Sequence, residues 1–109
     1  MSYLDELKLL TAWDTEPELT EDHLNVALAD ASLNDVDGRS PTDLDWVPTY
    51  DLNAAAAKVW LIKAARAAAT VDSPSSGEVT AKVFDNCRAM ARIYSAKRSA
   101  SVAISTDNR

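Results

Sequence analysis

His23 and Cys87 are the only histidine and the only cysteine in this sequence of 109 residues. A histidine acts as a general base or a metal ligand only where partner side chains converge on it, and the sequence pattern marks no such partners for His23. Because His23 follows two acids in the first turn of an expected helix, we predict a solvated surface position. Cys87 falls on the apolar stripe of another expected helix, which predicts a buried, unreactive thiol.

Aspartates with the chemistry of calcium ligands are spread through the middle of the chain, at Asp30, Asp35, Asp37, Asp43 and Asp45. An EF-hand loop needs glycine at position six, and counting back from Gly38 places Leu33 at the first ligand position. We therefore expect these aspartates to cap turns instead. The sequence contains no glycine-rich phosphate loop and no recognisable set of serine, histidine and aspartate. We expect no enzyme activity, no metal and no cofactor.

Basic residues in the second half of the chain raise the hypothesis of DNA binding through Lys63, Arg66, Arg88 and Arg92. They are spread along two expected helices whose aromatic residues fall on the core side. The formal net charge is −6, whereas nucleic-acid-binding domains are usually basic. Solvated or acid-paired side chains are the preferred interpretation, and a small helical DNA-binding regulator stays as the alternative function.

An all-α fold must position these residues, because glycine is scarce and no segment alternates β-branched with polar residues. We predict a small bundle of about four helices, over about 2–12, about 21–33, from after Pro48 to about 70, and from a capping box at Ser75 and Glu78 to about 96. A structured loop, 34–51, precedes the long third helix. The apolar side chains expected to order this loop by self-packing are Leu44, Trp46, Val47 and Tyr50.

The last helix is predicted to be amphipathic, since its apolar residues keep helical spacing. They are Val79, Val83, Phe84, Cys87, Met90, Ala91 and Tyr94. The alanine-rich third helix is different, because only Lys58, Lys63 and Arg66 interrupt its apolar surface, and they share one side of it. A helix so apolar is either central in its core or shared with a neighbouring molecule. Its longest charge-free run, 52–57, is too short to span a membrane.

Charge is distributed unevenly along the chain. Residues 1–51 contain 13 acids and 2 bases, whereas residues 52–109 contain 4 acids and 9 bases. Two interpretations stay open: intramolecular pairing of the two halves, which we prefer, or head-to-tail association between different surfaces of neighbouring copies. The single cysteine fits a reducing compartment, and the N-terminal segment lacks the basic region of a secretory signal.

Four segments taken together resemble a known family: "LTEDHLNVALADAS", "DVDGRSPTDLDWVPTYDLNAAAAKVW", the basic alanine-rich helix, and "VFDNCRAMARIYSA". This combination, which covers most of residues 10–96, resembles the head-to-tail adaptor (head completion or connector) proteins of tailed bacteriophages. The resemblance implies a non-enzymatic protein without cofactor that is made in the bacterial host cytoplasm and located in the head-tail neck of the virion. Such adaptors form a ring, typically of twelve copies, beneath the portal protein, and dock the next neck protein, a stopper or tail terminator. DNA passes through the ring without specific binding.

The resemblance also suggests roles for parts of this chain. Residues 1–96 are expected to form the helical adaptor domain, and residues 97–109 a flexible tail that a partner orders. The resemblance and the apolar third helix together predict a subunit interface. Its residues are Trp46, Tyr50, Val59, Trp60, Leu61, Lys63 and Arg66. Core filling is the other interpretation for Trp46 and Trp60. Portal binding is predicted for Arg92, Lys97, Arg98, Val102 and Ile104.

Overall fold

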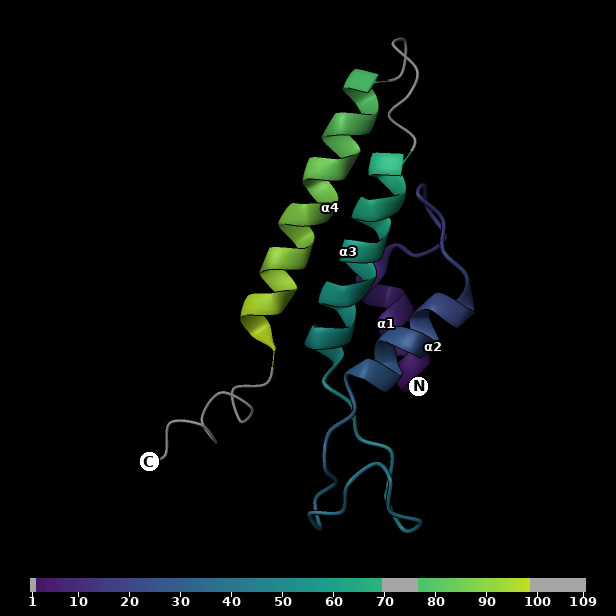
Figure 1. Ribbon diagram of the computed structural model, residues 1–109, viewed down its shortest axis with the longest axis vertical. Coiled ribbons are helices and arrows are strands. Elements are labelled where there is room, and N and C mark those ends of the chain that lie inside the picture. Colours follow the sequence, from purple (N-terminus) through teal and green to yellow (C-terminus); the bar gives the residue numbers. More distant parts are fainter. Residues whose placement is uncertain (1, 70–76, 99–109) are drawn as a thin grey trace.

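The computed structural model describes residues 2–69 and 77–98, and this part of the chain contains four helices and no strand (Figure 1). The helices are α1 (Tyr3–Thr11), α2 (Glu21–Asp30), α3 (Leu52–Ala69) and α4 (Gly77–Lys97). The predicted all-α bundle with a long alanine-rich central helix is confirmed. Of the predicted tail, 97–109, only Lys97 and Arg98 are described, and Val102 and Ile104 lie outside the described residues.

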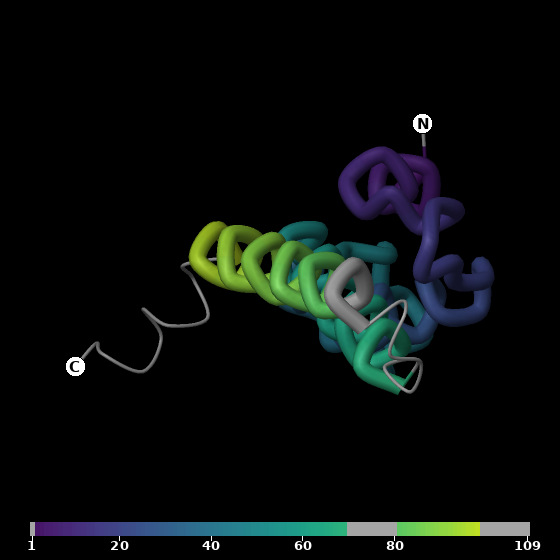
Figure 2. Tube along the Cα trace, turned by 90° about the horizontal axis from the view of Figure 1, so that it is seen from above, coloured from purple at the N-terminus to yellow at the C-terminus, as the bar shows by residue number. Residues whose placement is uncertain are grey.

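α3 is the central element of the fold. α4 runs alongside α3, and α1 and α2 pack against other faces of α3 (Figures 1 and 2), where Tyr94 of α4 also reaches the core that they share. The core of buried residues lies where α1, α2 and α3 meet, and consists of Leu7, Leu19, Leu24, Ala27, Leu28, Ala31, Ala55, Ala56 and Val59. The small alanines of α3 allow its neighbours to approach closely on both sides, which explains how an alanine-rich helix becomes central.

Local hydrogen bonds fix where α1 begins and ends. The Ser2 hydroxyl accepts the Asp5 N–H at 3.1 Å, and the Asp5 carboxylate accepts the Ser2 N–H at 3.4 Å, so a capping box opens α1. The hydrogen bond from the Ser2 backbone, followed by that from the Ser2 side chain, holds the pKa of Asp5 below its ordinary value. α1 ends at Ala12, whose φ of 44° lies in the left-handed region that terminates helices.

α2 ends three residues earlier than predicted. The sequence predicted a helix to about Leu33, but Ala31 leaves the helix and Ser32 forms an isolated antiparallel bridge with Tyr50. The Leu33 N–H donates to the Thr49 carbonyl at 2.8 Å. The two ends of the 34–51 loop are therefore joined by backbone pairing, and this tertiary contact competes with the last turn of the helix.

α3 begins, and the described part of α4 packs, as their sequences indicate. The Asp51 carboxylate accepts the Ala54 N–H at 3.0 Å, so Asp51 caps α3. On the predicted stripe of α4, Cys87 and Ala91 are buried, and the remaining members that can be described are partly buried: Val83, Phe84, Met90 and Tyr94. The Val79 side chain and the Ser75 cap lie outside the described part.

Candidate interaction surfaces

Lys63 is buried, with only 1% of its surface exposed. Its Nζ donates three hydrogen bonds to carbonyl oxygens of the segment between α1 and α2, to Ala12 at 2.8 Å, Thr15 at 2.7 Å and Pro17 at 3.0 Å. An ammonium has three donors, so this carbonyl cradle satisfies all of them. The predictions that Lys63 lies on a solvated or acid-paired face, contacts DNA or forms part of a subunit interface are therefore wrong for this residue, since its charge is used inside the protomer.

The surroundings of Lys63 bring α1, α3 and α4 together. Trp60 donates its indole N–H to the Leu10 carbonyl at 3.2 Å, and Lys63 Nζ lies 5.5 Å from the Trp60 ring centre. Desolvation lowers the pKa of Lys63, although Cys87 and nearby carboxylates act in the opposite direction. Burial likewise raises the pKa of the Cys87 thiol, against the effect of Lys63. A buried thiol with a raised pKa is a poor nucleophile, so the prediction of burial at Cys87 is confirmed.

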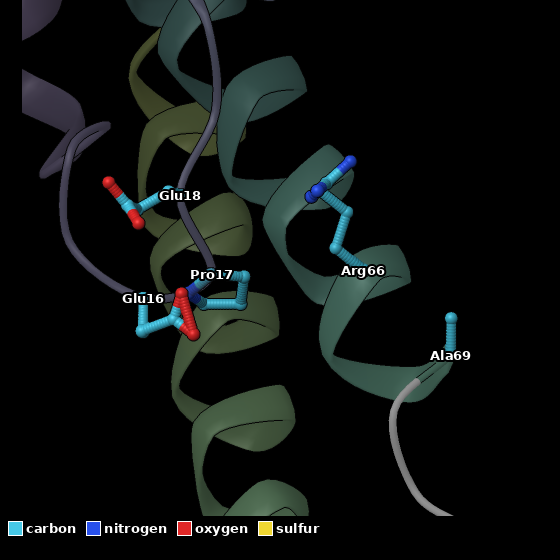
Figure 3. Close-up of a pocket in the computed structure, with 5 residues that line it drawn as sticks. All are labelled: Glu16, Pro17, Glu18, Arg66 and Ala69. Atoms are coloured by element: carbon cyan, nitrogen blue, oxygen red, sulfur yellow. The ribbon is translucent and has the colours of Figure 1, made fainter.

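An open pocket of about 380 Å³ lies between the segment that joins α1 to α2 and the C-terminal turns of α3 (Figure 3). It is lined by Glu16, Pro17, Glu18, Arg66 and Ala69. In the described part of the chain, Arg66 makes no ion pair with these carboxylates. The lining contains charged groups but neither a thiol nor an imidazole, so it offers no nucleophile with a neighbouring base.

His23 has a local structural role. It is half-buried, and its Nδ1 accepts the backbone N–H of Thr20 at 3.1 Å, which caps the start of α2. The predicted fully solvated position is thus only partly correct, because an imidazole three residues after the N-cap reaches back like the acid of a capping box. Across residues 2–69 and 77–98, no three histidine, cysteine or acidic side chains gather into a group able to hold a metal ion.

The 34–51 loop is organised around Asp35, whose side chain is 1% exposed. Asp35 Oδ1 accepts the N–H groups of Asp37 and Arg39 at 2.9 Å each, and Oδ2 accepts that of Val47 at 3.0 Å. Desolvation raises the pKa of this carboxyl, but the three backbone donors and the Arg39 guanidinium outweigh it and hold the pKa below its ordinary value. The prediction of turn chemistry is confirmed for Asp35.

The aromatic residues of this loop are half-buried, whereas its aliphatic residues are exposed. Trp46 donates its indole N–H to the Leu33 carbonyl at 2.9 Å and packs edge to face on Tyr50, with ring centres 5.7 Å apart. In contrast, Leu44 is 102% exposed, and Val47 is 56% exposed, so the prediction that they self-pack is wrong. They stay exposed because the backbone bonds to Asp35 and Leu33 already order the loop. Val36 is likewise exposed, and Figure 1 shows the loop projecting past the ends of the helices.

The seven residues predicted for a subunit interface do not form one surface. Val59 and Lys63 are buried, and Trp46, Tyr50 and Trp60 are half-buried in contacts within the protomer. Only Leu61 and Arg66 are exposed. The apolar surplus expected on α3 therefore lies mainly elsewhere. The large apolar side chains that remain exposed are Leu9, Val26, Val36, Leu44, Val47, Leu61 and Ile93.

The described residues predicted to bind the portal lie on the C-terminal turns of α4. Arg92, Lys97 and Arg98 are all exposed there. The Lys97 carbonyl accepts a hydrogen bond from the Asn53 side chain at 3.1 Å, which fixes the end of α4 to the start of α3. Lys97 Nζ also lies 5.6 Å from the Tyr94 ring centre.

The uneven charge of the sequence is partly paired within the molecule. In the described residues, the ion pairs join Lys8 to Glu21, Arg39 to Asp35 and Asp37, and Lys58 to Asp30. The pair of Lys58 with Asp30 joins the two halves of the chain, as the preferred interpretation expects. None of these pairs involves α4, and α3 lies between α2 and α4 (Figure 1).

Sequence reasoning missed the carbonyl cradle and the outer faces of α2 and α4. The cradle has no sequence signal, because its acceptors are main-chain atoms. The outer faces do have one: Asp22, Val26 and Asp30 recur every four residues in α2, as Arg88 and Arg92 do in α4.

None of the helices described is both long and apolar enough to cross a lipid bilayer. No family model, no curated protein and no solved structure matches this chain.

Proposed function

We propose that this protein is a structural head-to-tail adaptor of a phage neck. Copies form a ring below the portal, typically of twelve, that extends the DNA channel and docks the next neck protein, a stopper or tail terminator. The resemblance in four segments of the sequence suggests this role. The fold is compatible with it, since the chain is an all-α bundle with a projecting loop before its central helix.

The observation that supports the proposal best is the 34–51 loop. Asp35 and the Trp46 indole fix its backbone through hydrogen bonds, yet Val36 and Leu44 remain almost fully exposed. An ordered loop with exposed aliphatic side chains does not stabilise a monomer. A docking surface, in contrast, requires both an ordered backbone and exposed apolar side chains. We assign this loop to the contact with the next neck protein, and the C-terminal residues from Lys97 onward to the portal.

The test is to mix the purified chain with tailless particles that carry the portal and to image them. The proposal expects an added ring of density below the portal. A Val36→Asp/Leu44→Asp variant should still add this ring but fail to recruit the next neck protein. Val102→Asp/Ile104→Asp should lose the ring itself, and Leu9→Asp, a matched exposed apolar position on α1, should lose neither. Particles that gain no density from the unmodified chain would rule out the adaptor role.

DNA binding remains the alternative, supported only by the exposed Arg66, Arg88 and Arg92, since Lys63 is buried. It predicts duplex affinity that falls steeply with added salt. Titration of a labelled duplex at low ionic strength distinguishes the two functions, because the adaptor proposal expects only weak binding that Arg88→Ala and Arg92→Ala barely change.

A further inference from the structure

The outer face of α4 is basic around an apolar centre. Ile93 is 46% exposed, although the other large apolar residues of this helix that the structure describes are at least partly buried. Half-buried Ala89 precedes Ile93 by four residues, and the exposed Asp85 precedes Ala89 by four. The exposed bases of this helix are Lys82, Arg88, Arg92 and Lys97, so its outer surface has a net positive charge although it includes Asp85. No ion pair involves these arginines in the described part of the chain. This face therefore presents one exposed apolar side chain, Ile93, on a helix surface with a net positive charge.

The outer face of α2 has the opposite charge around a similar centre. Val26 is 55% exposed, with Asp22 one helical turn before it and Asp30 one turn after it. Asp30 pairs with Lys58, whereas Asp22 has no ion pair among the described residues. The α2 face thus matches the α4 face in its exposed apolar side chain and complements it in charge.

These two faces cannot meet within one protomer, because α3 lies between α2 and α4 (Figure 1). Pairing α4 with α4 of another copy, or α2 with α2, would bring like charges together, which opposes association. The remaining arrangement places α4 of one copy against α2 of another.

We propose that copies of this chain associate head to tail, with Ile93, Ala89 and Arg92 of one copy packed on Val26 and Asp22 of the next. The interface is heterologous, because the α4 face of one copy contacts the α2 face of the next. A growing chain therefore has a free α2 face at one end and a free α4 face at the other, and it grows until these two faces meet and close a ring. This inference deepens the proposed adaptor function and rests on it for its biological meaning. It replaces the portal contact that the sequence suggested for Arg92.

Disulfide trapping tests the contact with this chain alone. In a Cys87→Ala background, a Val26→Cys/Ile93→Cys variant is oxidised gently and run on a non-reducing gel. Head-to-tail contact gives a ladder that extends beyond the dimer, whereas either single-cysteine variant stops at the dimer. Leu9→Cys/Ile93→Cys is the matched control, because Leu9 is even more exposed but lies on α1. A ladder no faster than that of the control would overturn the proposal.

Charge reversal gives an independent readout on the same trapping assay. Arg92→Glu or Asp22→Arg alone should slow ladder growth about tenfold, because each opposes like charges. Both changes in one chain should restore growth, since the carboxylate introduced at position 92 of one copy then meets the guanidinium introduced at position 22 of the next. Failure of the double change to restore growth would also overturn the proposed register. Thermal melting of each variant checks that these exposed positions leave the fold intact.

The outcomes for this contact and for the adaptor role are separable. A ladder from Val26→Cys/Ile93→Cys without added density on portal particles supports this interface and rejects the neck function. Added density without the ladder rejects this interface and leaves the neck function standing.

Discussion

The two sides of α3 are held by different forces. On the α1 and α2 side, side chains of α3 bond to main-chain atoms: Lys63 donates to three carbonyls, and Trp60 donates to a fourth. On the α4 side, the described contacts are mainly those of an apolar stripe, with Cys87 and Ala91 at its centre. Directional bonds suit the irregular segment between α1 and α2, which presents main-chain carbonyls to α3, while a regular helix needs only a fitting surface.

Removing the charge of Lys63 should weaken the contact of α3 with the segment between α1 and α2, and we expect this change to have the largest effect on stability. Lys63→Met keeps the length of the side chain but leaves the three carbonyls without their donor, at a cost of about 3 kcal/mol in the free energy of unfolding. Lys58→Met is the matched control, because Lys58 lies on the same helix in an exposed pair with Asp30 and should cost less than about 1 kcal/mol. Denaturant unfolding measures both. Equal losses would show that the carbonyl cradle is unimportant.

Overpacking the contact between α3 and α4 should lower the free energy of unfolding by a smaller amount. Ala91 is 3% exposed against α3, so Ala91→Leu forces extra methyl groups into a filled contact, at a cost of about 2 kcal/mol. Ala96→Leu introduces the same side chain at an exposed position of α4 and should stay within about 0.5 kcal/mol. The same unfolding experiment applies. If Ala91→Leu proved neutral, α4 would be packed more loosely than its burial indicates.

The same contrast explains what the sequence could predict. Regular packing leaves a period in the sequence, so the stripe of α4 and the caps at Ser2 and Asp51 were predictable from residue types and spacing. The end of α2 was not, because the bridge between Ser32 and Tyr50 depends on a tertiary contact. Helical periodicity placed Lys63 with the other bases of α3, since a helical wheel contains no information about carbonyls almost 50 residues away.

The candidate surfaces were predictable to a smaller extent than the fold. Uneven charge indicated two complementary surfaces, but only the packing order shows that α3 lies between the bases of α4 and the acids of α2. Sequence pattern assigned Leu44 and Val47 to the interior of the loop, because apolar residues in a long loop usually order it. Here Asp35 orders the loop through backbone hydrogen bonds, which frees both side chains for exposure.

The smallest expected effect is a pH dependence confined to this loop. Because the folded pKa of Asp35 is depressed, its stabilisation is complete above the ordinary value of 3.8 and is lost as the pH falls through the lower, folded value. Acidification below about pH 4 should therefore shift the NMR indole signal of Trp46, which bonds to Leu33 in the loop, before that of Trp60. Asp35→Asn should show the shifted Trp46 signal already at neutral pH, since an amide N–H₂ cannot accept the Val47 N–H.

A matched variant separates the loop from the rest of the acid response. Asp5 also has a depressed pKa, through its hydrogen bonds to Ser2, and it loses its stabilising effect in the same pH range. Asp5→Asn should remove that contribution from the unfolding curve while the Trp46 signal keeps its titration, because α1 and the loop are capped independently. If the indole signals of Trp46 and Trp60 shifted at the same pH in every variant, the loop would not be ordered independently of the helices. The hydrogen bonds around Asp35 would then not order a separate docking surface.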